Sequence, residues 1–103
     1  MIALPDWADA DLAADYGITG RQLDILAGIA KGMTNGDIGR ALFLSEETVK
    51  THIKGLYRAL RLTGRATSRG AAVAIAYDVG LLRTRAMRNE RARAHADELR
   101  VVA

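Results

Sequence analysis

Hydrophobic residues recur every three or four positions along most of the chain, and capping residues and glycines divide this pattern into short segments. Thr19 and Gln22 are spaced as a capping box at the start of one segment, and Gly32 is suited to end it. Thr34 and Asp37 repeat the capping arrangement at the start of a shorter segment. The periodicity therefore predicts two consecutive helices here.

The next segment begins after only about three residues, at Ser45, which is suited to cap a helix. Glu46 and Glu47 follow it and complement the positive end of the helix dipole. We expect this helix to extend over residues 45–61. Two helices joined by so short a connection cross steeply, which predicts a helix-turn-helix arrangement.

Weaker helix signals flank this central part. Near the N-terminus, apolar residues at helical spacing predict a short accessory helix that covers the core: Leu4, Trp7, Ala8, Leu12 and Tyr16. Its first turn is expected at Pro5 and Asp6 and its end at Gly17. A last helix is predicted over Ala71 to Val79, capped by Thr67 or Ser68 and stopped by Gly80.

Composition supports an all-α fold, because alanine and leucine dominate, aromatic residues make up 5% and there is one proline. The length of 103 residues suits one core. We expect an accessory helix over residues 1–17, a helix-turn-helix domain over residues 18–82 and an arginine-rich helical tail over residues 83–103, frayed or held by a partner.

The absence of cysteine excludes disulfides and thiolate chemistry, and two distant histidines make no metal site. The longest apolar run is too short for a bilayer, and the acidic N-terminus is unlike a signal peptide. We therefore expect a protein of the cytoplasm, associated with the nucleoid, that needs no metal, cofactor or membrane. No P-loop or nucleophile-base set indicates an enzyme.

Charge is unevenly distributed. The first twenty residues carry −4 from four aspartates and the remainder carries +7, for a net charge of +3. This asymmetry favours a polyanionic partner such as nucleic acid, although charge alone also fits a solvated arginine-rich surface.

A helical projection of residues 45–61 separates two faces. Val49, Ile53, Leu56 and Leu60 share one sector, which we expect to pack on the core. The opposite sector holds a basic set: Lys50, Thr51, Lys54, Arg58 and Arg61. A helix fits the major groove, where side chains of its first half reach base edges and later arginines reach phosphates.

These motifs resemble the LuxR-type (GerE-like) helix-turn-helix domain of the winged-helix-like superfamily. The run from Thr19 to His52 is similar to the family pattern T-x-R-E, G-x-[ST]-N-x-[ED]-I-A and L-x-[IL]-S-x-x-T-V-K-x-H, and residues 69–80 are similar to R-x-x-A-V-x-x-A-x-x-x-G. The resemblance covers roughly residues 18–82 and implies a four-helix domain. With so short a chain, we expect a stand-alone domain.

The resemblance also implies roles for individual residues. Base reading falls to Lys50, Thr51 and Lys54, and phosphate contact to Thr48 and His52, beside the arginines of the basic face, Arg58 and Arg61. His52 taken alone would more often be a solvated side chain. Dimerisation falls to the last helix, through Ala72, Val73, Ala76 and Val79.

Several positions depart from the family pattern. Gln22 replaces a glutamate, and Gly55 replaces a common asparagine. Gly36 and Gly39 replace larger or alanine side chains. Each of these two glycines is expected to lower the stability of its helix by roughly 1 kcal/mol relative to alanine. Arg69 lies seven residues past Leu62, where the family's arginine usually lies three past it. Either the preceding helix is a turn longer, or the loop near residues 63–66 bulges.

We therefore expect a sequence-specific, double-stranded DNA-binding transcriptional regulator that forms a homodimer. An alternative hypothesis is a small interaction module that binds a regulator or an RNA polymerase subunit through Trp7, Met87 and the tail. A sigma-factor fragment would share the motif, but His52 and the last helix argue against it.

Overall fold

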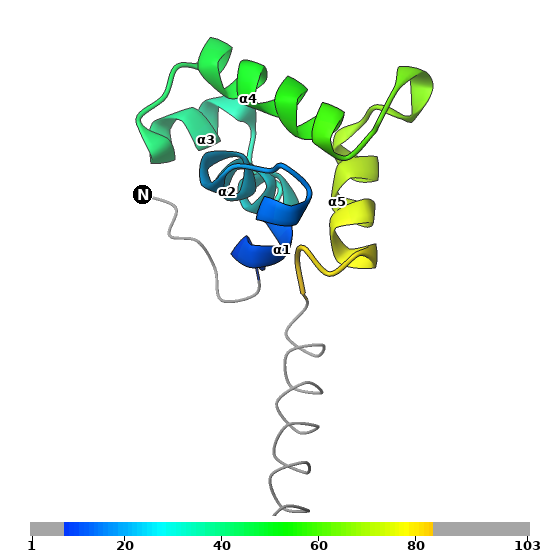
Figure 1. The fold of residues 1–103 in the computed structure, drawn as a ribbon. Helices are drawn as coiled ribbons and strands as arrows, with labels where there is room; N and C mark the ends of the chain where they lie inside the picture. The colour runs from blue at the N-terminus through cyan, green and yellow to red at the C-terminus, as the bar shows by residue number, and fades with distance from the viewer. Residues whose placement is uncertain (1–7, 84–103) are drawn as a thin grey trace, which may run out of the picture.

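The computed structural model describes residues 8–83, which form an all-α domain with no strand in that range (Figure 1). The elements are α1 (Ala10–Asp15), α2 (Gly20–Ala30), α3 (Asn35–Leu42), α4 (Glu46–Ala59), the 3-10 helix η1 (Gly64–Ala66) and α5 (Arg69–Asp78). None of the helices within residues 8–83 is long and apolar enough to span a membrane. The predicted tail and the proposed contacts of Leu4, Trp7 and Met87 lie outside the described residues.

A side chain caps the start of each of the five α-helices in the described range. In every case its oxygen accepts a hydrogen bond from the backbone N–H three residues later, at Asp9, Thr19, Thr34, Ser45 and Ser68. Such a bond satisfies one of the donors that a helix start leaves without a partner. The predicted helix starts at α2, α3 and α4 are confirmed, and the cap of α5 is Ser68 rather than Thr67.

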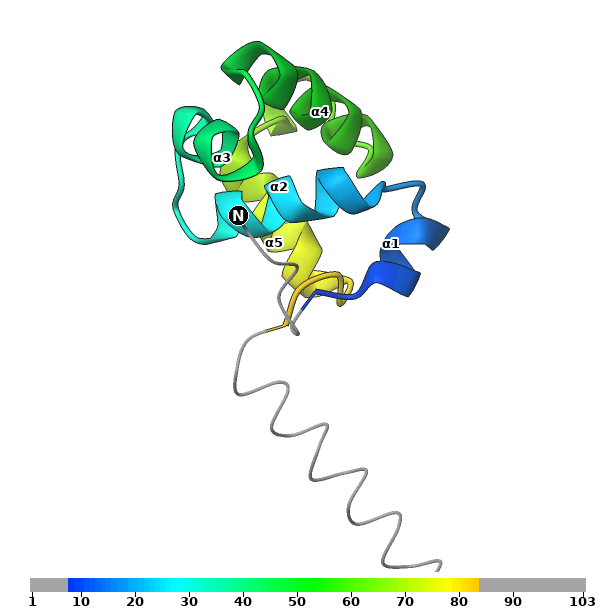
Figure 2. The ribbon, with the colours of Figure 1, turned by 90° about the vertical axis from the view of Figure 1, so that its left-hand side faces the viewer.

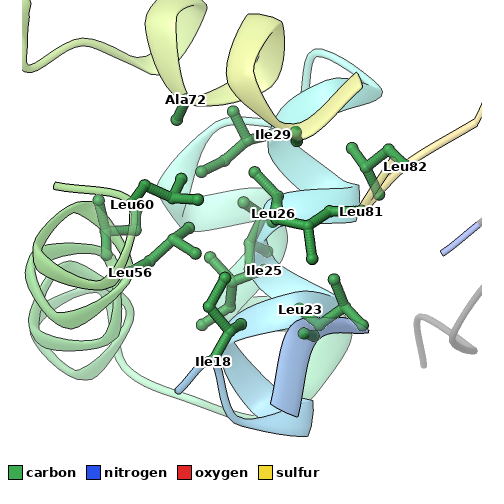
Figure 3. Packing of buried hydrophobic residues seen from close by; sticks show 14 of the residues in the cluster. Ile18, Leu23, Ile25, Leu26, Ile29, Leu56, Leu60, Ala72, Leu81 and Leu82 are labelled. Carbon is green, nitrogen blue, oxygen red and sulfur yellow. The ribbon is translucent and has the colours of Figure 1, made fainter. Parts of the chain in front are cut away.

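The core is built around α2, which contacts α1, α3, α4 and α5. Leu23, Ile25 and Leu26 of α2 have no exposed surface. Figure 3 shows these side chains between those of α4, such as Leu56, and Leu81 and Leu82, which follow α5. Burial of each such side chain stabilises the fold by about 1.5–3 kcal/mol, so α2 fixes the positions of the surrounding helices.

The N-terminal helix starts later than predicted. Ala8 and Asp9 are not helical: Ala8 forms an isolated antiparallel bridge with Leu82, and the Asp9 N–H donates to the carbonyl of Leu81 at 2.9 Å. Asp9 also accepts from the Arg83 guanidinium at 2.7 Å. An aspartate that caps a helix takes an extended backbone, and here that backbone pairs with the chain after α5, so the helical spacing gave too early a start.

The segment between α4 and α5 decides between the two interpretations of Arg69. The helix α4 ends at Ala59, and Arg61 has a left-handed backbone with φ 59°. The chain then forms η1 before α5 begins at Arg69. The extra residues therefore make a longer loop, and the alternative of a longer helix is wrong. The prediction that helix 45–61 includes Arg61 is wrong for the same reason.

Arg69 connects this loop to the helix-turn-helix. Its guanidinium donates to Asn35 Oδ1 at 2.6 Å and to the backbone carbonyl of Met33. A cation at the first position of a helix is disfavoured by the helix dipole. These two bonds at the start of α3 offset that cost and fix α5 against α3 across the longer loop.

Candidate nucleic-acid interface

Three residues, Phe43 to Ser45, connect α3 to α4. Phe43 ends α3 with a left-handed backbone of φ 59°, and the Leu44 N–H donates to the Gly39 carbonyl at 2.8 Å. A Cβ on Gly39 would lie 2.5 Å from the Leu44 carbonyl oxygen, closer than side chains approach backbone. The glycine that the sequence marks as costly in a helix therefore lets the turn pack tightly onto α3.

The helix α4 presents one face to the core and the other to solvent, as predicted. Val49 and Leu56 are 0% exposed, and Ile53 and Leu60 are 7% exposed. The basic set is exposed throughout: Lys50, Thr51, Lys54, Arg58 and Arg61. Figures 1 and 2 both show α4 along the upper edge of the domain, on the opposite side from the end of the described chain. No other described element covers this face.

Thr48 and His52 lie half-buried along the flank of the basic face. The Ser45 hydroxyl donates to Thr48 Oγ1 at 2.9 Å, and the Thr48 N–H donates to Ser45 Oγ at 3.1 Å. Because its oxygen accepts from Ser45, the Thr48 hydroxyl has its own proton to offer to an acceptor outside the domain. The flank thus places a hydroxyl and an imidazole beside the cations.

Acidic side chains lie in the first turns of both α3 and α4: Asp37 in α3, and Glu46 and Glu47 in α4. Lys50 Nζ lies 3.5 Å from Glu47 Oε1, and the Thr51 hydroxyl donates to the Glu47 backbone carbonyl at 3.0 Å. On α3, hydrogen bonds from the Thr34 backbone and hydroxyl, with Arg40 nearby, lower the pKa of Asp37. Asp37 is therefore ionised at neutral pH and holds the second capping box of the sequence in place.

Two departures from the family pattern contact each other. Gln22 keeps the predicted capping box, because its Oε1 accepts from the Thr19 N–H and its own N–H donates to Thr19 Oγ1. A Cβ on Gly55 would lie 2.6 Å from Gln22 Nε2, so the glutamine amide fills the space above the glycine. Gly55 thus lets Gln22 of α2 pack against the middle of α4.

The predicted dimer residues separate into two groups. Ala72 and Ala76 are 0% exposed inside the domain, so their side chains cannot contact a second subunit, and those two assignments are wrong. Small residues on that side of α5 instead allow it to pack closely on the core. Val73 is half-buried and Val79 is 36% exposed, so these two remain at the surface of α5.

Other features of the described residues offer no second site. A shallow groove of about 310 Å³ lies between α2 and α5, and its one charged lining residue, Arg69, is already bonded to Met33 and Asn35. Residues 8–83 contain no group of three or more histidine, aspartate or glutamate side chains placed to hold a metal ion.

Comparison with known proteins gives a consistent match. The model of the family "Bacterial regulatory proteins, luxR family" matches residues 17–72. The chain is 41% identical over 64 residues to the "Uncharacterized transcriptional regulatory protein YhcZ" of Bacillus subtilis, covering 62% of this chain and 29% of that protein. It is 41% identical over 69 residues to the "Putative HTH-type transcriptional regulator YhjB" of Escherichia coli, covering 63% and 34%.

A third relative is the "Nitrate/nitrite response regulator protein homolog" of Haemophilus influenzae, which is 46% identical over 48 residues, covering 47% of this chain and 23% of that protein. The chain thus spans about a quarter to a third of the length of these three relatives. No solved structure gives a significant match.

Proposed function

The chain belongs to the luxR family of bacterial regulatory proteins, and from this premise we propose that it regulates transcription by binding double-stranded DNA sequence-specifically. The observation that carries the proposal is the basic face of α4, which is exposed while the opposite face is buried. A helix held in this way inserts into the major groove as one rigid body with α3 and the turn.

Base reading is assigned to Lys50, Thr51 and Lys54, which lie in the first two-thirds of α4 on its exposed side. Lysine donates to the guanine acceptors O6 and N7. The Thr51 hydroxyl already donates to the Glu47 carbonyl. Thr51 therefore presents its methyl group and an oxygen lone pair, which suit a thymine methyl or a base amine.

Phosphate contact is assigned to Thr48 and His52 on the flank and to Arg58 and Arg61 at the far end of the basic face. Neutral donors and cations beside a recognition helix fix its position on the duplex without reading sequence. These contacts supply much of the affinity and make it dependent on salt, because each neutralised phosphate releases counterions.

The proposal extends to a homodimer that uses the surface of α5 around Val73 and Val79, with the two recognition helices about 34–36 Å apart in successive major grooves. It places the protein in the cytoplasm at the nucleoid. Contact with RNA polymerase or another regulator would accompany DNA binding. The proposal includes no catalytic role.

The test is selection of bound duplexes from a random pool, followed by affinity measurement at several salt concentrations. Changing Lys50 and Lys54 together to alanine should weaken binding to the selected site by about 1–3 kcal/mol for each lost base contact. Each lysine is also changed singly, and Lys31→Ala is the matched control for these single variants, because it removes one positive charge from the end of α2, outside the basic face.

A palindromic site with a steep salt dependence, lost in the double variant and kept in the control, supports the proposal. Equal loss in the control, or affinity for duplex that does not change with salt, refutes it. The second of these results would favour the interaction module instead.

A further inference from the structure

Glu47 is the one carboxylate within the basic face of α4. At about 100° per residue, Lys50 lies roughly 60° to one side of Glu47 and Thr51 roughly 40° to the other, while Arg58 lies about 20° away. Glu47 stands at the second position of the helix and is 87% exposed. The helix dipole does not by itself explain a carboxylate on this face, because Glu46 in the same first turn already interacts favourably with the dipole.

Both residues next to Glu47 on this face contact it. Its Oε1 lies 3.5 Å from Lys50 Nζ, and its backbone carbonyl accepts the Thr51 hydroxyl at 3.0 Å. Lys50 and Thr51 are the two residues proposed above to read bases at the start of the helix. The carboxylate therefore sits where the first turn of a recognition helix meets base edges.

Glu46 differs from its neighbour in direction. A Cβ on Gly36 would lie 3.0 Å from Glu46 Oε1 and 3.5 Å from an Arg40 guanidinium nitrogen, so the Glu46 carboxylate leans over α3. The adjacent glutamates thus share charge, an exposed position and the first turn of α4, but Glu47 faces the solvent side of α4 and Glu46 faces α3.

We propose that Glu47 is a specificity-determining residue whose carboxylate accepts a hydrogen bond from the N4 amine of a cytosine, while Lys50 donates to the paired guanine. This inference rests on the proposed function. An ionised carboxylate only accepts hydrogen bonds, and the one polar group that cytosine presents in the major groove is a donor, its N4 amine. Adenine presents a donor beside the N7 acceptor, which repels a carboxylate.

The pair of side chains matches the edge of one C·G base pair. Across that edge the groups run from the cytosine donor to the guanine acceptors O6 and N7, and Glu47 and Lys50 offer an acceptor and a donor side by side. The same carboxylate repels phosphate oxygens and holds the Lys50 ammonium near itself. Binding to duplex that lacks the C·G pair is therefore weakened.

The experiment compares the full chain with Glu47→Ala, Glu47→Gln and Glu46→Ala by selection from a random duplex pool and by affinity for random-sequence duplex across a salt series. The wild type should select a C·G pair at one position of each half-site. Glu47→Ala should lose that preference, on the order of tenfold. Its binding to random duplex should become several-fold tighter, and the salt slope should steepen by about 0.9 as Lys50 reaches a phosphate.

Glu47→Gln should shift the selected position toward A·T, because glutamine pairs with adenine through N6 and N7. Glu46→Ala removes the same charge from the same helical turn and should keep the wild-type preference. An unchanged selected site in Glu47→Ala, or the same change in Glu46→Ala, would overturn the role of Glu47 and leave DNA binding intact. Failure of the wild type to bind duplex would overturn the proposed function itself.

Discussion

Replacing Arg69 by alanine should destabilise the domain strongly, although this residue lies outside the basic face. Two hydrogen bonds from the charged guanidinium are lost, to Asn35 and to the Met33 carbonyl, and each is worth about 1.5–3 kcal/mol in typical proteins. Arg69 is only half-buried, and its removal relieves an unfavourable charge at the start of α5. We therefore expect a net loss of about 2–4 kcal/mol.

The free energy of unfolding can be measured by urea titration, followed by circular dichroism at the helical signal. Arg65→Ala is the control, because Arg65 is an exposed arginine in η1 at the spacing that the family usually shows, and its loss should change stability by less than about 0.5 kcal/mol. Arg69→Lys keeps the charge but loses the planar guanidinium that donates two hydrogen bonds. Its loss of unfolding free energy should therefore lie between the losses of Arg65→Ala and Arg69→Ala.

A double-mutant cycle with Asn35→Ala isolates one of the two bonds. We expect a coupling energy between Arg69 and Asn35 of about 1 kcal/mol, because the two side chains are in direct contact. The reasoning is refuted if Arg69→Ala costs no more than Arg65→Ala, or if the cycle gives no coupling. Either result would mean that α5 is held by core packing alone.

Three further predictions concern other contacts. Gly39→Val should lose about 2 kcal/mol or more in urea unfolding because its Cβ would meet the Leu44 carbonyl, whereas Gly70→Val, in open space, should lose less than about 1 kcal/mol. Asp9→Ala should cost about 1–3 kcal/mol and speed amide exchange in α1, since it removes a helix cap and a partly buried ion pair; unchanged exchange would contradict this. Asp37→Asn should be less stable than the wild type at pH 7, and the difference should shrink as pH falls below 3.8 through the lowered pKa of Asp37; a difference independent of pH would be evidence against it.

Features that depend on neighbouring residues in the sequence were predicted well. The caps at Thr19, Thr34 and Ser45 act on backbone groups three residues away, so the residue types alone locate the starts of α2, α3 and α4. The division of α4 into two faces follows from helical geometry, which the sequence contains in full. The core positions and the exposed basic set were therefore both predicted.

Features that depend on distant contacts were not predicted. The extended backbone of Asp9 is set by the Leu81 carbonyl, which follows in the chain only after all five helices. The burial of Ala72 and Ala76 depends on which side of α5 meets α2, and alanine periodicity is too weak to decide that. Gln22 and Gly55 contact each other, although each taken alone only replaces the glutamate or asparagine that the family usually has at its position.

The bridge between Ala8 and Leu82 places the beginning and the end of the described chain side by side, on the opposite side of the domain from α4 in both Figure 1 and Figure 2. Neighbouring ends of this kind tolerate fusion, because added polypeptide leaves the packed interior unchanged. A reporter, an affinity tag or a sensory module joined directly to either end of residues 8–83 would thus leave the domain on the side opposite the basic face of α4. This placement of its ends makes the domain suitable for fusion to other domains.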